Sequence, residues 1–78
     1  MTAIAFDRVC DVFDSNNIDV VYYNIEKKIL QVRFNNTTQY RYHGVEIGDF
    51  ARIVGAESVG ATFNKWKNSP AAMRFERC

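Results

Sequence analysis

The clearest pattern in the chain is a strict alternation of apolar and polar side chains over residues 29–34. The residues at every second position are apolar, namely Leu30, Val32 and Phe34. Gln31 and Arg33 occupy the positions between them. Successive side chains of a strand point to opposite faces, so this period of two predicts a half-buried strand.

Two neighbouring segments have the same character. Residues 18–23 are rich in β-branched and aromatic side chains, which favour strands. In residues 39–43, Tyr40 and Tyr42 alternate with polar side chains. The segments that precede and separate these strands, residues 14–17, 24–28 and 35–38, hold turn-forming Asn, Asp, Ser or Thr. The pattern predicts a three-stranded antiparallel meander.

The flanking segments have helical spacing. Residues 3–13 predict a short amphipathic helix, although Val9 and Val12 leave an edge strand as the alternative. Residues 45–55 predict a helix that Gly55 ends, and Ser58 is suited to cap a second helix before Pro70. The predicted fold is α+β: a three-stranded antiparallel β-meander packed on one face by two C-terminal helices, with a short N-terminal helix.

Composition narrows the class of protein. The chain has 78 residues, of which 47% are hydrophobic, and its net charge is +1, so neither disorder nor several domains is expected. Charged and polar residues interrupt every apolar run, which excludes a membrane-spanning helix. We see no signal peptide and expect a single cytoplasmic domain, residues 1–78, with Cys10 and Cys78 reduced.

The small net charge hides an uneven distribution. Residues 1–20 carry four Asp and one Arg, a net charge of −3. Residues 60–78 carry Lys65, Lys67, Arg74 and Arg77 against Glu76, a net charge of +3. Any binding hypothesis therefore has to account for an acidic front end and a basic back end.

Catalysis is not expected. The chain has one His and two distant Cys, which do not supply the ligand spacing of a zinc site. The Ser58-x-Gly60 step lacks the flanking glycine of a nucleophile elbow and the Gly-Lys of a phosphate-binding loop. We predict a non-enzymatic binding module without metal or cofactor.

Nucleic-acid binding is the first hypothesis for that module. Pairing of the second and third strands places Arg33, Arg41 and His43 on one sheet face, with Lys27 and Lys28 at the end of the first hairpin. The basic C-terminal part adds Lys65 and Lys67. Alternatively, these residues form the solvated face of a one-sided sheet, which the modest sequence pI of about 7.8 favours. Tyr40 and Tyr42 suit either a stacking platform or the core, and their alternation favours the core.

Protein binding is the second hypothesis. Apolar residues outside the clearest core pattern are candidates for exposed anchors: Val12, Phe13, Trp66, Met73 and Phe75. Packing on the chain's own sheet is the alternative for each of them, and it is the favoured one. A domain of this size also suits a small phage or accessory protein that targets a host factor.

Residues 15–68 together resemble the KTSC domain, which is named for the C-terminal domain of certain lysyl-tRNA synthetases and also occurs as a stand-alone bacterial protein. The residues that carry the resemblance are Ser15, Ile18, Tyr23-Asn24, Leu30-x-Val32-x-Phe34, Tyr40-x-Tyr42, Val45, and the closing Ala56, Ser58, Gly60, Phe63 and Asn64. Within that motif, Tyr40, Tyr42, Ser58, Gly60, Phe63 and Asn64 are expected to be structural. The resemblance implies an α+β core over residues 15–68, an N-terminal extension over 1–14, a tail over 69–78, and binding of RNA or tRNA.

The chain departs from this pattern at one turn. The family usually has Gly after the second strand, where this chain has Thr37. We expect Asn36 to take the left-handed position in its place, because Asn tolerates that conformation. Val45-Glu46 also replaces the usual Val-Pro at the start of the helix, and Glu is electrostatically acceptable there.

Overall fold

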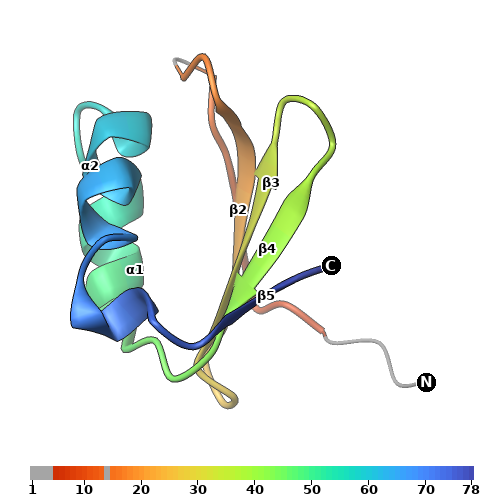
Figure 1. Ribbon diagram of the computed structural model, residues 1–78, viewed down its shortest axis with the longest axis vertical. Coiled ribbons are helices and arrows are strands. Elements are labelled where there is room, and N and C mark those ends of the chain that lie inside the picture. Colours follow the sequence, from red (N-terminus) through yellow and green to blue (C-terminus); the bar gives the residue numbers. More distant parts are fainter. Residues whose placement is uncertain (1–4, 14) are drawn as a thin grey trace.

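A computed structural model describes residues 5–13 and 15–78 of the chain. Five antiparallel strands form one sheet in the order β1-β2-β3-β4-β5, and two helices pack on one of its faces (Figure 1). The strands are β1 (Arg8–Asp11), β2 (Ile18–Asn24), β3 (Ile29–Phe34), β4 (Gln39–Tyr42) and β5 (Phe75–Arg77). The helices are α1 (Ile47–Val54), α2 (Val59–Trp66) and the short 3-10 helix η1 (Pro70–Ala72).

The α+β class, the central meander and the two helices on one face agree with the sequence prediction, but the sheet has five strands and not three. The predicted N-terminal helix is wrong for the described part of its segment, because residues 8–11 form the edge strand β1 beside β2. Ala3 and Ile4 lie outside the described residues. The C-terminal segment, for which no element was predicted, adds β5 beside β4.

A bulge in β2 decides which side chains reach the core. Ile18 pairs with Phe34, Val20 pairs with Arg33, and the register shifts between Ile18 and Val20. The extra residue lets both Ile18 and Val21 face the helices, which a regular strand does not allow for residues three apart. Val20 therefore lies on the sheet face away from the helices, here called the open face, together with Arg33.

Aromatic rings fill the space between the sheet and the helices. Tyr23 stacks on Phe50 of α1 with ring centroids 4.9 Å apart. Tyr42 meets Phe63 and Trp66 of α2 edge to face, at 5.8 and 5.1 Å. Full burial of each such side chain contributes about 1.5–3 kcal/mol, so these contacts hold both helices on the sheet.

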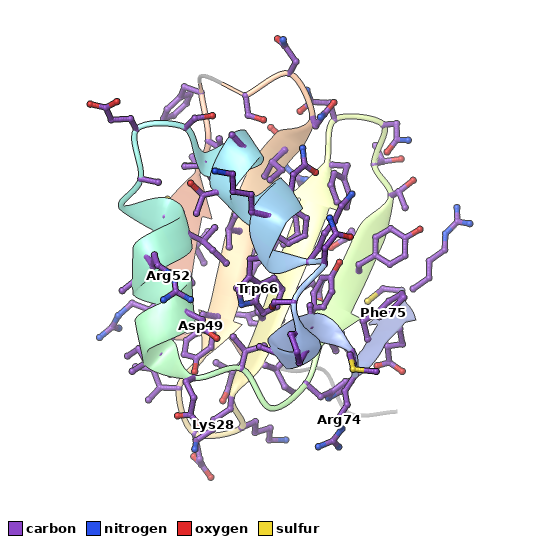
Figure 2. All side chains as sticks on the ribbon, turned by 60° about the vertical axis from the view of Figure 1, so that its left-hand side comes forward. Lys28, Asp49, Arg52, Trp66, Arg74 and Phe75 are labelled. Atoms are coloured by element: carbon purple, nitrogen blue, oxygen red, sulfur yellow. The ribbon has the colours of Figure 1, made fainter. Side chains whose placement is uncertain are left out.

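Trp66 belongs to this core, and its assignment as an exposed anchor is wrong. Its side chain is 5% exposed, and its indole N–H donates to Asp49 Oδ2 of α1 at 3.2 Å. Figure 2 shows Trp66 close to Asp49. Val12 is buried as well. Both residues extend the predicted core beyond the central alternation.

Ser58 and Ser15 fix the start of α2. Ser58 caps the helix as predicted, accepting a hydrogen bond from the Ala61 N–H. Ser15 Oγ accepts the N–H of Ile18 at 3.1 Å and lies 2.8 Å from where a Cβ on Gly60 would stand. Gly60 is therefore required by the close approach of the β1–β2 loop to the first turn of α2.

In the β3–β4 turn, which lacks the usual glycine, the left-handed residue is not the one that was predicted. Thr37 itself takes the left-handed conformation, at φ +70°, whereas Asn36 does not. The Thr37 N–H donates to the Phe34 carbonyl, and the Phe34 N–H donates to the Thr38 carbonyl. This is the three-residue hairpin loop in which the residue after a type I turn is left-handed. The length of the loop, rather than the preference of the residue, therefore determines that position 37 takes the left-handed conformation.

Candidate ligand-binding groove

The basic residues on the open face are largely neutralised by neighbouring groups. Arg33 donates to Asp19 at 2.7 Å, and this hydrogen bond raises the pKa of the Arg33 guanidinium. Arg41 lies 3.7 Å from Glu76, whose carboxylate also contacts His43 at 3.2 Å. The predicted convergence of Arg33, Arg41 and His43 on one face is present, but acids contributed by β2 and β5 offset much of their charge.

A polar network also occupies the centre of this face. Gln31 is buried, donates to Gln39 at 2.7 Å and accepts from Arg41 Nε at 2.9 Å. Cys78 Sγ lies 3.8 Å from the same Gln31 oxygen. These hydrogen bonds engage the Gln31 side chain and the Nε of Arg41 within the protein.

The four predicted lysines lie in two separate parts of the molecule, the β2–β3 turn and the end of α2. Lys27 and Lys28 lie in the β2–β3 turn, which is at the opposite end of the sheet from the β3–β4 turn (Figure 1). Lys28 forms an ion pair with Glu46 at 3.1 Å. Lys65 and Lys67 are exposed at the end of α2. The structure therefore does not join these lysines into one patch.

Lys67 lines a groove of about 580 Å³ between the last turn of α2 and the β3–β4 end of the sheet. Phe34 and Tyr40 also line it, with ring centroids 5.8 Å apart. Arg77 of β5 also lines the groove. It pairs with Tyr40 and therefore lies on the same face of the sheet as Tyr40. The remaining lining residues are polar: Asn16, Asn17, Asn35, Asn36, Thr38 and Asn64.

Backbone geometry brings the asparagines together. The Asn35 side-chain N–H donates to the Asn16 carbonyl at 2.7 Å, and the Asn35 backbone N–H donates to the Asn17 carbonyl at 2.8 Å. These bonds hold the β1–β2 loop against the β3–β4 turn. Among the described residues, the side chains of Asn16, Asn17 and Asn64 have no hydrogen-bond partner. Their amides are available to a ligand as donors and acceptors.

A smaller space of about 390 Å³ adjoins the first and shares Phe34, Tyr40 and Lys67 with it. Tyr42 and Phe75 give this second space an aromatic lining, and Figure 2 shows Phe75 at the outer edge of the sheet. Burial raises the pKa of the Tyr42 hydroxyl, so this group is neutral at physiological pH. Tyr42 is buried in the core, and Tyr40 is half-buried against it, which agrees with the preference for a core role.

The remaining anchor candidates do not form one surface. Phe13 is 92% exposed beside the β1–β2 loop, and Met73 is 75% exposed after η1. These two segments lie at opposite ends of the molecule (Figure 1). Phe75 is 57% exposed but its ring packs against Tyr42 at 5.6 Å. Of the five predicted anchors, only Phe75 lies at a concave site.

Sequence reasoning missed Arg77 and the loop asparagines as candidate ligand contacts. Arg77 belongs to a segment for which no element was predicted, so its neighbours were unknown. The asparagine pairs at 16–17 and 35–36 were interpreted only as turn residues. The presence of two asparagines in each of these turns could have indicated a shared site, because hairpin turns at the same end of a meander lie next to each other. Asn64, expected to be structural, lies exposed on the groove.

The fold places the chain among α+β domains built on an antiparallel sheet with two helices. The family model described as the KTSC domain matches residues 14–75, and the chain belongs to this family. A KTSC domain protein from Yersinia pestis has a similar crystal structure, with a TM-score of 0.73 and 21% sequence identity. That similarity covers 91% of this chain and 93% of the other, and it shows a shared fold. No curated protein sequence matches the chain.

Three further observations concern the described part of the chain. None of its helices is long and apolar enough to cross a membrane. Its His, Cys, Asp and Glu side chains form no group of three that is suited to hold a metal ion. Both cysteines are free thiols, with Cys10 packed beside the core and Cys78 exposed.

Proposed function

We propose that this protein is a small non-enzymatic binding module that binds RNA through the groove between α2 and the β3–β4 end of the sheet. The observation that carries the proposal is the composition of that groove. Aromatic rings, amides without a hydrogen-bond partner among the described residues, and two cations, Lys67 and Arg77, line one concave surface. Proteins bind unpaired nucleotides with this combination of groups, using rings for bases and cations for phosphates.

Electrostatics favour the groove over the open face. Neither Lys67 nor Arg77 forms an ion pair with any described residue, whereas Arg33 and Arg41 each contact a carboxylate. A cation without a carboxylate partner can neutralise a phosphate at no cost of breaking an existing pair. Both groove cations come from residues 60–78, the segment with a net charge of +3. The uneven charge distribution is thus consistent with phosphate contacts on this side.

The resemblance to a domain named for certain lysyl-tRNA synthetases makes tRNA the first RNA to test. The protein-binding alternative has weaker support, because the exposed Phe13 and Met73 are far apart and no single apolar patch joins them. We further propose a cytoplasmic location, where RNA ligands and reduced thiols are both expected.

A fluorescence anisotropy titration of labelled single-stranded RNA and tRNA tests the proposal at several salt concentrations. Two phosphate contacts predict that log K falls with log salt concentration at a slope of about −1.4. Lys67→Gln should weaken binding and reduce the slope by about 0.7. Lys65→Gln is the matched control, since it removes the same charge two residues earlier, at a position outside the groove.

Three results would contradict the proposal. Absence of binding at low salt would exclude RNA as the ligand. Equal losses for Lys65→Gln and Lys67→Gln would indicate diffuse attraction to the basic end and not a defined site. Loss of binding only in the Arg33→Ala, Arg41→Ala double variant would indicate that RNA binds to the open face.

A further inference from the structure

The groove is divided into two compartments of different chemistry. The first, about 580 Å³, is bordered by amides from three segments and is called here the amide compartment. The second, about 390 Å³, is bordered by Tyr42 and Phe75 and is called the aromatic compartment. Each lies within the range of about 300–1,000 Å³ that is common for small-ligand sites. Each is therefore large enough for one ligand unit of its own.

Lys67 lies where the two compartments meet. It lines both of them, as do Phe34 and Tyr40. An ammonium group is a compact point charge with three donors, which suits a phosphate oxygen approached from either side. A ligand that occupies both compartments would thus carry its negative charge between two uncharged, ring-containing units.

From this arrangement, and resting on the proposed function, we infer that the groove binds two consecutive nucleotides of an unpaired RNA strand. One base lies in the amide compartment, where the side chains of Asn16, Asn17 and Asn64 border the space with donors and acceptors for its edge. The other base lies in the aromatic compartment against Phe75. The phosphate that links the two nucleosides lies at Lys67.

The strand has to be unpaired for this arrangement. Stacking on aromatic side chains uses the face of a base, and amides bond to its Watson–Crick edge. In an A-form duplex both the faces and these edges are already occupied by neighbouring bases. The two compartments therefore distinguish single strands from duplexes, whereas phosphate contacts alone do not.

Calorimetric titration with a series of defined ligands tests the inference: a nucleoside monophosphate, a dinucleotide, a tetranucleotide, and a duplex of the same sequence. We expect affinity to rise at least ten-fold from the mononucleotide to the dinucleotide, because the second base adds a stacking contact. Extension from the dinucleotide to the tetranucleotide should raise the affinity by less than ten-fold. The duplex should bind at least ten-fold more weakly than the single strand.

The variant Phe75→Leu tests whether the second base lies in the aromatic compartment. This variant should lower dinucleotide affinity about ten-fold and leave mononucleotide affinity unchanged. Phe13→Leu, an equally conservative change at an exposed Phe outside the groove, is the control and should alter neither. Because Phe75 is 57% exposed, the variant is expected to fold, which its circular dichroism spectrum verifies.

The outcomes separate this inference from the proposed function. If no RNA binds, both fall. If RNA binds but the dinucleotide is no better than the mononucleotide, or the duplex matches the single strand, RNA binding stands and the two-compartment arrangement is wrong. An unchanged dinucleotide affinity in Phe75→Leu also overturns it.

Discussion

Thr37→Gly should stabilise the protein, because Thr37 is a β-branched residue held at φ +70°. The left-handed conformation costs a residue with a Cβ about 1–2 kcal/mol, whereas glycine adopts it freely. Glycine also makes the unfolded chain more flexible, which opposes folding by about 0.5–1 kcal/mol. Thr37 is exposed, so its removal sacrifices little packing. The net expectation is a gain of about 0.5–1 kcal/mol.

Thermal unfolding followed by circular dichroism measures this gain. A domain of this size changes its Tm by about 4–8 °C per kcal/mol, so Thr37→Gly should raise Tm by roughly 2–8 °C. Thr38→Gly is the matched control at the next residue, where φ is not positive. It should lower Tm by a similar amount, because it adds flexibility without relieving strain. A drop in Tm for Thr37→Gly equal to that of the control would refute the strain argument.

Two further predictions concern the core. Gly60→Ala should destabilise the domain by about 1–3 kcal/mol, since its Cβ would stand 2.8 Å from Ser15 Oγ. Urea unfolding measures this loss, which should shrink in a Ser15→Ala background; an unchanged loss would refute the contact. Burial raises the pKa of Tyr23 and Tyr42 above the ordinary value of 10.0, so unfolded tyrosines release protons first as pH rises. The stability they contribute is complete below about pH 10 and is lost as pH rises through their folded pKa values. Tyr42→Phe should make stability fall less steeply there, and an identical pH profile would contradict this.

The centre of the fold was predictable because its signal is local. Period-two alternation over residues 29–34 and the spacing of Val59, Phe63 and Trp66 identify elements within single segments. Ser58 was predicted correctly as a cap for the same reason. Each of these depends on neighbours within a few residues along the chain.

The two edge strands were not predictable in this way. β1 has four residues and is defined by its pairing with β2 across residues 12–17. β5 has three residues and is defined by its pairing with β4, which is far away in sequence. Segment 3–13 does have helical spacing, but the described residues 8–11 gain backbone hydrogen bonds by joining β2. Tertiary pairing thus outweighs the weak local preference of a short segment.

The groove was partly predictable. Lys67 was identified as a candidate from charge, whereas Tyr40 was expected to be structural because its alternation with polar residues favours the core. Arg77 was not, because its position depends on the register between β4 and β5. The pairing of Arg33 with Asp19 was likewise hidden, since it depends on the bulge that places both at the open face.

The most direct test of the central claim is an NMR titration of the isotope-labelled protein with a short single-stranded RNA. Shift changes should concentrate on the backbone and side-chain amides that border the groove, including Asn35, Asn64 and Lys67. The open-face residues Arg33 and Arg41 should be little affected. Changes confined to the open face, or no changes at saturating RNA, would contradict the claim that this protein binds RNA in the groove.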